Sequence, residues 1–223
     1  MARHVSTPQA LTSPFVLLTG FDAFGGAILN PSWLAVQALD GEFVAGHQLV
    51  AAQLPTIFDD SVPELVRLLR LYKPALVICV GQAGGRSALS LERIAINISD
   101  ANMADNAGKQ PADVSVVASG PAAYFSTLPI KAMQQTLHQA CIAVEVSQTA
   151  GTFVCNHVFY ALMHALATKR NFKGIRGGFI HVPYLPEQGL PCMRLDDMVH
   201  ALRLVVACAL STSGAACKVP VKE

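Results

Sequence analysis

Residues 74–80 read PALVICV, an uninterrupted run of apolar side chains that ends at Gly81. A strand that is apolar at every position is typical of a parallel sheet, because helices cover both of its faces. Around this run, amphipathic positions predict a helix over 60–71, and alternation predicts a strand over 47–54. Strands that alternate with helices predict an α/β fold, here a three-layer α/β/α sandwich around a largely parallel, mixed and twisted sheet.

The same periodicities predict the remaining elements. The strand patterns cover residues 15–19, 89–98, 142–149 and 177–182. The helix patterns cover residues 30–39, 129–140, 155–170 and 196–209. Asp60 and Ser61 are expected to cap the helix over 60–71, since their side chains accept hydrogen bonds from free N–H groups. The polar stretch over 99–118 predicts a loop that is long enough to suspect a function.

The length of 223 residues favours one domain. We expect an α/β domain over 14–213, a loose N-terminal extension over 1–13 and a C-terminal tail over 214–223. Apolar residues make up 52% of the chain and charged residues 14%, a combination that opposes disorder and suggests that subunit contacts hide part of the surface.

Charge and cysteine usage exclude several classes of protein. The net charge is +1 and no dense Lys/Arg run occurs, so nothing indicates binding to nucleic acid or to an anionic membrane. No apolar stretch approaches the length that spans a bilayer. The six cysteines are scattered, without a CxxC motif or zinc-type spacing to His. The chain therefore reads as a reduced, cytoplasmic protein without a metal site.

Cys155 lies where the predicted strand over 142–149 turns into the predicted helix over 155–170. A helix N-terminus presents free N–H groups and the positive end of a dipole. This environment favours the thiolate, which is the nucleophilic form of cysteine. The alternative is that Cys155 is a small buried hydrophobic residue.

His181 is the candidate base for this thiol. The strand over 142–149, the helix and the strand over 177–182 form a predicted βαβ crossover, which often joins neighbouring strands. Axes of neighbouring strands lie about 4.8 Å apart, so a histidine at the carboxyl end of the second strand would lie near Cys155. His157, two positions after Cys155, would face away from it on the helix. The alternative for His181 is a satisfied core histidine.

Glu92 lies in the apolar segment LERIAIN, residues 91–97. Glutamate is disfavoured in strands and is rarely buried without a partner. A carboxylate that orients the imidazole of a cysteine–histidine pair would explain it. The alternative is a local ion pair with Arg86 or another basic residue.

Four ordered motifs carry a resemblance to a known family. They are TGFD (19–22) with FGG (24–26) and NPSW (30–33), GQAGGR (81–86) before ERIAIN (92–97), AGTFVCN (150–156), and GFIH (178–181). From Val16 to about Gln188 the chain resembles the cysteine-type pyroglutamyl peptidases, also called pyrrolidone-carboxylate peptidases.

The resemblance implies that the protein removes an N-terminal pyroglutamyl (5-oxoprolyl) residue from peptides through a thioester acyl-enzyme, without a metal or cofactor. It places the nucleophile at Cys155, the base at His181 and the orienting acid at Glu92. N–H groups at the start of the helix, with the glycine loop 81–85 as a second source, would hold the oxyanion. Family members commonly form dimers or tetramers, so a homodimer or homotetramer is expected.

The resemblance also implies a pocket for the flat, uncharged lactam ring. Its walls would be aromatic, the side chain of Asn30 and the backbone of Gln82 would bond the lactam, and two further residues would line it. The implied pocket residues are Phe21, Phe24, Phe153, Asn30, Gln82, Thr56 and Met103. Phe21 and Phe24 are placed in a glycine-flanked loop. The alternative for the three phenylalanines, Phe153 above all, is core packing.

The chain departs from the family pattern at two places. Ala23 stands where the family usually has proline, and Asn102-Met103-Ala104 replaces the usual Arg-Ile-Pro. The second departure motivates an alternative, a catalytically impaired relative that binds peptides. A further alternative is a different enzyme on the same scaffold, such as a purine-nucleoside phosphorylase-like protein. That would require a phosphate site, and no Gly-rich loop with Lys, Ser or Thr of that kind is present.

Overall fold

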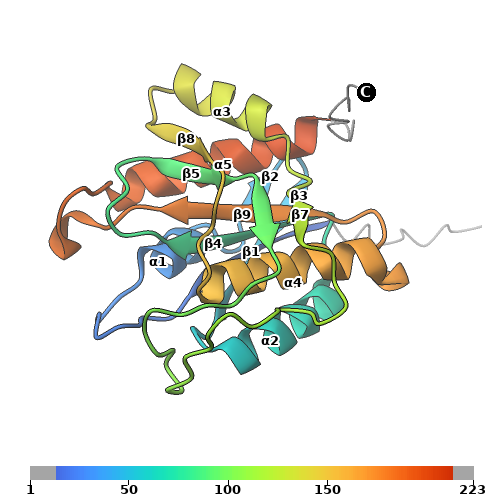
Figure 1. Cartoon of the computed structure of the whole chain (residues 1–223). Coiled ribbons are helices and arrows are strands. Elements are labelled where there is room, and N and C mark those ends of the chain that lie inside the picture. Colours follow the sequence, from blue (N-terminus) through green and yellow to red (C-terminus); the bar gives the residue numbers. More distant parts are fainter. Residues whose placement is uncertain (1–13, 213–223) are drawn as a thin grey trace, which may run out of the picture.

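A seven-stranded sheet, in the order β2-β3-β1-β4-β9-β5-β8, forms the centre of the fold (Figure 1). The computed structural model describes residues 14–212, so the predicted extension over 1–13 and the tail over 214–223 lie outside the described residues. The strands of this sheet are β1 (Phe15–Phe21), β2 (Phe43–Val44), β3 (His47–Leu54), β4 (Leu76–Gln82), β5 (Leu89–Glu92), β8 (Val144–Ser147) and β9 (Arg176–Val182).

The strand directions make the sheet mixed. Strands β1, β3, β4 and β9 run parallel to one another. At one edge β2 pairs antiparallel with β3. Towards the other edge β5 pairs antiparallel with β9 and parallel with β8. The largely parallel, mixed sheet predicted from the sequence is therefore confirmed.

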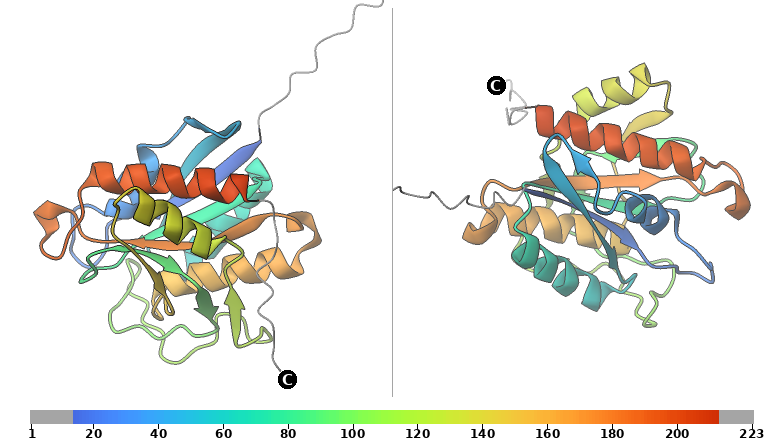
Figure 2. Two further views of the ribbon diagram at one scale, coloured as in Figure 1. Left: turned by 90° about the horizontal axis from the view of Figure 1, so that it is seen from above. Right: turned by 180° about the vertical axis from the view of Figure 1, so that it is seen from behind.

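Helices cover both faces of this sheet (Figure 2). They are α1 (Pro31–Gln37), α2 (Phe58–Tyr72), α3 (Ile130–Gln139), α4 (Val154–Thr168) and α5 (Leu195–Ser211). Alternate residues of β4 explain the two cores: Leu76 and Ile78 pack with α1, α3 and α5, whereas Val77 and Cys79 pack with α2 and α4. The apolar run over 74–80 thus lies between two helical layers, and the three-layer α/β/α prediction is confirmed.

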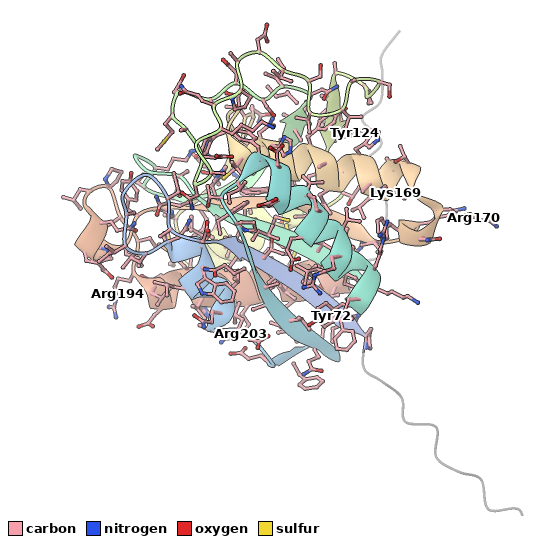
Figure 3. The ribbon with its side chains drawn as sticks, turned by 90° about the horizontal axis from the view of Figure 1, so that it is seen from below. Tyr72, Tyr124, Lys169, Arg170, Arg194 and Arg203 are labelled. Carbon is pink, nitrogen blue, oxygen red and sulfur yellow. The ribbon has the colours of Figure 1, made fainter. Side chains whose placement is uncertain are left out.

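A second sheet of two antiparallel strands, β6 (Ile94–Ile96) and β7 (Ala123–Phe125), lies against α4. Tyr124 of β7 contacts this helix (Figure 3), and its hydroxyl lies 2.9 Å from Nδ1 of His164. The single strand predicted over 89–98 is therefore wrong. It divides at Arg93 into β5 and β6, because the Asn156 side chain on α4 binds the backbone of Ile96 and holds β6 away from the main sheet.

The predicted βαβ crossover through α4 is also wrong. Strand β5 lies between β8 and β9, and β8 runs antiparallel to β9. Leu89 and Leu91 of β5 are buried in the core on the α1, α3 and α5 face, which stabilises β5 in this inner position of the sheet. The loop over 148–153 then carries the chain from the end of β8 to the start of α4.

Helix α2 begins at Phe58, and no side chain of its own N-cap residue, Ile57, closes its first turn. Instead the Asp105 carboxylate accepts a 2.8 Å hydrogen bond from the Phe58 N–H. The predicted cap by Asp60 and Ser61 is therefore wrong, because a residue from the long loop performs that task. This contact ties the loop over 99–118 to α2.

Candidate active site

Cys155 is the second residue of α4, and its sulfur lies against the end of β4. A Cβ atom added at Gly81 would lie 2.8 Å from the Cys155 Sγ and 2.9 Å from the Phe179 ring. Only glycine at this position lets the sulfur approach the strand so closely. The position of the thiol is therefore determined by the packing of α4 on β4 and β9. It does not depend on the pair of neighbouring strands that the sequence predicted.

His181 lies beside this sulfur on the same face of the sheet. It pairs in register with Gly81 on the adjacent parallel strand, so the two Cα–Cβ directions point to the same side. The same-face neighbour Phe179 packs on the imidazole, with ring centroids 4.9 Å apart. His181 is only 3% exposed, so its ring is fixed by packing.

Glu92 is fully buried and holds the imidazole from β5. Its Oε1 lies 2.7 Å from Nδ1 of His181. The same oxygen accepts a 2.8 Å hydrogen bond from Nη1 of Arg86. The two explanations for Glu92 considered from the sequence, an imidazole partner and an ion pair with Arg86, therefore occur together at one carboxylate oxygen.

Arg86 links this carboxylate to the segment that precedes the cysteine. Its Nη2 donates a 3.1 Å hydrogen bond to the carbonyl of Thr149, in the loop over 148–153. The other Glu92 oxygen, Oε2, is buried and has no partner within residues 14–212. Arg86 thus holds the Glu92 oxygen that faces His181, and it also binds the loop that leads into α4.

Cys155 is half-buried, with its sulfur packed against Gly81 and Phe179, and desolvation of the sulfur raises its pKa to about 12. The negative charge of Glu92 also raises this pKa, while the charge of Arg86 and the hydrogen bond from the residue's own N–H act in the opposite direction. The prediction that the helix N-terminus favours the thiolate is therefore wrong for the unliganded site, because desolvation outweighs the N–H groups.

Alkylation of Cys155 is expected to accelerate with pH without levelling off near neutrality. Because only the thiolate reacts, and because the thiol pKa is about 12, the rate with iodoacetamide should rise about tenfold per pH unit between pH 7 and 10. Mass spectrometry of the Cys155 peptide measures this rate. A plateau below pH 8 would instead indicate a thiolate–imidazolium pair in the free protein.

The start of α4 offers unpaired donors beside the thiol. The first bond of the helix runs from the His157 N–H to the Phe153 carbonyl, 3.1 Å away, which leaves the preceding N–H groups without intrahelical acceptors. The Asn156 side chain fixes this turn through hydrogen bonds to the backbone of Ile96 and Ile98. Asn156 belongs to the motif AGTFVCN. Its role in fixing the first turn of α4 depends on contacts with β6 and Ile98, which the sequence does not reveal.

His157 points to a different environment from the cysteine. Its Nδ1 lies 3.0 Å from the Ser99 hydroxyl, and its ring packs against Phe58. Burial lowers the pKa of His157 to about 4, so this imidazole is neutral at physiological pH. It supports the packing of the 99–118 loop on α4.

Aromatic rings form a wall that includes Phe153, two residues before the cysteine. The Phe24 and Phe153 rings lie 5.9 Å apart between centroids, and Phe153 in turn packs edge-on against Phe58. A cavity of about 570 Å³ begins at this wall. Its lining residues are Phe24, Gly25, Gly26, Ala27, Ile28, Leu29, Gln82, Met103, Tyr184, Glu187 and Gln188.

Of the pocket residues implied by resemblance, Phe24, Gln82 and Met103 line this cavity and Phe153 stands behind Phe24. Phe21 is not in the glycine-flanked loop: it is the last residue of β1, only 2% exposed, and packs on Phe179. The loop placement of Phe21 is therefore wrong, because strand pairing with β3 continues through this position.

Asn30 and Thr56 are buried and bind the loop that carries Phe24. Nδ2 of Asn30 donates to the Asp22 carbonyl at 2.9 Å, and Oδ1 of Asn30 caps α1 by accepting from the Ser32 N–H. Thr56 donates its N–H to the Asp22 carboxylate. These contacts order the aromatic wall, and one amide hydrogen of Asn30 remains without a protein acceptor among the described contacts.

The sequence did not single out the segment over 184–188, which forms the far side of the cavity. Its residues show no motif that distinguishes them from an ordinary loop, and their place depends on β9. Within residues 14–212 no helix is long and apolar enough to cross a membrane, and no cluster of three or more His, Cys, Asp or Glu side chains could hold a metal ion.

Three comparisons place this geometry among known proteins. The family model described as "Pyroglutamyl peptidase" matches residues 15–212. A pyrrolidone-carboxylate peptidase of Cupriavidus taiwanensis is 58% identical over 205 residues, which cover 89% of this chain and 94% of that protein. The crystal structure of pyroglutamyl peptidase I from Bacillus amyloliquefaciens is 46% identical with a TM-score of 0.85, over 88% of this chain and 96% of that one.

A more distant solved structure has the same fold. A mutant pyrrolidone carboxyl peptidase from the hyperthermophile Pyrococcus furiosus is 40% identical with a TM-score of 0.84, over 87% of this chain and 97% of that one. The similarity therefore extends over nearly all of the residues that the structure describes.

Proposed function

The chain belongs to the pyroglutamyl peptidase family, and we propose that it hydrolyses the bond after an N-terminal pyroglutamyl residue as a cysteine peptidase with a Cys155–His181–Glu92 triad. One observation above all supports the triad. The 2.7 Å contact of His181 with Glu92 lies on the same sheet face as the Cys155 sulfur, which rests against the register partner of His181.

The ring nitrogens of His181 have distinct tasks in this proposal. A carboxylate only accepts hydrogen bonds, so Nδ1 of His181 carries the proton that Glu92 accepts. Nε2 is then the free base. In this proposal the thiol proton of Cys155 passes to Nε2 as the sulfur attacks the pyroglutamyl carbonyl carbon.

The attack forms the C–S bond and moves the carbonyl electron pair onto oxygen. The first N–H groups of α4, which have no intrahelical acceptors, are suited to hold this oxyanion. Collapse breaks the C–N bond, and the leaving amine takes the proton from Nε2, which leaves a thioester on Cys155. Water, deprotonated by Nε2, then attacks the thioester, releases pyroglutamate and restores the thiol.

The lactam ring fits the aromatic wall of the cavity. It is flat and uncharged, and Phe24 with Phe153 offers an apolar face. Gln82 and the remaining amide hydrogen of Asn30 are the proposed polar partners of the ring, while Met103 lines its outer side. Phe21 and Thr56 support this pocket from behind.

The purified protein is expected to hydrolyse a pyroglutamyl aminomethylcoumarin amide at least about 10³-fold faster than the matching prolyl amide. The two substrates differ at the lactam carbonyl, and a site that bonds such a group strongly rejects an analogue without it. Fluorescence release measures kcat/KM for both. A folded protein that turns over no pyroglutamyl amide would refute the proposal, and calorimetric binding of uncleaved peptide would favour the impaired relative.

We also propose a reduced, cytoplasmic protein that assembles as a homodimer or homotetramer. The five cysteines within the described residues are all free, which suits a reducing compartment. Large apolar side chains at the surface, among them Phe43, Phe125 and Leu190, suit subunit contacts.

A further inference from the structure

The cavity extends well beyond the wall assigned to the lactam. Its volume of about 570 Å³ lies in the range of pockets that hold drug-sized ligands, which is more than one five-membered ring requires. The additional space is lined by Tyr184, Glu187 and Gln188 on one side and by Ile28 and Leu29 on the other. The proposed reaction assigns no role to these five residues.

The segment over 184–188 is held firmly against the end of β4. Nε2 of Gln188 donates a 3.0 Å hydrogen bond to Oε1 of Gln82, and Oε1 of Gln188 accepts from the Leu185 N–H at 2.9 Å. The Tyr184 ring lies over Gly84, where a Cβ atom would come within clashing distance of the phenol. Glu187 therefore stands on an anchored 3-10 turn, Pro186–Gln188.

The segment over 184–188 lies where the part of the peptide that follows the pyroglutamyl residue is expected to bind. His181 must protonate the departing amine, so the residue after the pyroglutamyl group has to lie next to the imidazole. Tyr184 follows His181 by three residues, and Gln82 adjoins Gly81, which touches the Cys155 sulfur. With the ring placed on the Phe24 wall, the lining by Tyr184, Glu187 and Gln188 remains available to the leaving peptide.

The charge of this part of the cavity is negative. Glu187 is the only charged side chain among the described lining residues, and it forms no ion pair within residues 14–212. A pyroglutamyl peptide has no free α-ammonium group, because the lactam blocks it. Within the substrate, a positive charge near Glu187 can therefore come only from a side chain of the leaving peptide.

We propose that Tyr184, Glu187 and Gln188 form the subsite for the residue that follows the pyroglutamyl group, and that Glu187 makes this subsite favour Arg or Lys over Asp or Glu. The inference rests on the proposed peptidase function. Tyr184 offers an aromatic face to the stem of a basic side chain, and Gln188, held by Gln82, closes the inner end.

The test compares kcat/KM for pyroglutamyl-Arg, pyroglutamyl-Gln and pyroglutamyl-Glu peptide amides, with the coumarin amide as the reference for turnover. Since exposed charge pairs contribute modestly, the wild type should prefer Arg to Glu about tenfold at low salt. Glu187→Gln should bring this ratio near one, and Glu187→Lys should reverse it. High salt should reduce the preference of the wild type.

Asp197→Asn, an exposed carboxylate on α5 outside the cavity lining, is the matched control and should keep the wild-type ratio. If the coumarin amide is cleaved but the Arg-to-Glu ratio is near one and unmoved by Glu187→Lys, the subsite is refuted and the peptidase function stands. If the wild type cleaves no pyroglutamyl amide, the function itself fails.

Discussion

Replacing Cys155 with alanine is expected to lower kcat/KM for a pyroglutamyl amide by about 10⁵-fold or more, because the variant lacks the atom that forms the acyl-enzyme. Cys155→Ser should also lose most activity, since a hydroxyl at this position is a much weaker nucleophile without a stronger base. Both side chains fit the space against Gly81 that now holds the sulfur. Thermal unfolding should therefore stay close to that of the wild type.

Cys208→Ala is the matched control for this loss. Like Cys155, Cys208 is a half-buried free thiol on a helix, but it packs with the core on the α1, α3 and α5 face of the sheet. The activity of the Cys208→Ala variant should remain within about threefold of the wild type. Retention of more than about 1% of activity in Cys155→Ala would show that another group attacks the substrate. Peptide-level mass spectrometry of the wild type, quenched at low pH during turnover, would locate the thioester on the Cys155 peptide.

Replacing Glu92 with glutamine is expected to lower kcat by about 10³-fold or more. The amide is almost isosteric, and its oxygen could replace Oε1 towards His181 and Arg86, but the negative charge that both partners face is lost. The amide NH₂ can instead face Nδ1 of His181, which selects the wrong imidazole tautomer and removes Nε2 as a base. The expected loss falls mainly on kcat, since Glu92 is fully buried and does not line the described cavity.

The same variant should also be less stable by about 1–3 kcal/mol, because Arg86 keeps its charge and loses its carboxylate. Glu145→Gln is the control: this exposed carboxylate on the adjacent strand β8 accepts from the Ser90 hydroxyl, outside the triad. It should leave kcat nearly unchanged. A Glu92→Gln enzyme within threefold of wild-type kcat at every pH would contradict the proposed role of the carboxylate.

Patterns that are local in the sequence predicted most of the fold. The apolar run over 74–80 predicted a strand covered on both faces, and helical spacing predicted the helix that begins at Asn30-Pro31-Ser32, where Asn30 does cap α1. The strand and the helix each depend on residues that are only a few positions apart, so the local sequence is enough to predict them. The layer arrangement follows from them because each apolar face needs a partner.

Features that depend on distant segments could not be predicted. Nothing within 142–182 reveals that β5 separates β8 from β9, since strand order is decided by which apolar faces match across the sheet. The thiol pKa of Cys155 is a second case: the helix start is visible in the sequence, but burial against Gly81 and Phe179 is not. Cys155, His181 and Glu92 were nevertheless singled out as candidates, since each stood in a motif, and the fold brings all three to one face of the sheet.

The position of β9 within the sheet has a consequence for synthesis of the protein. This strand lies between β4 and β5, yet it is made long after both of them along the chain. A nascent chain that ends at Thr168 already contains the thiol and the carboxylate, but it lacks both the imidazole and the strand that joins the two halves. The proposed triad can therefore form only after His181 and β9 have been made, late in translation.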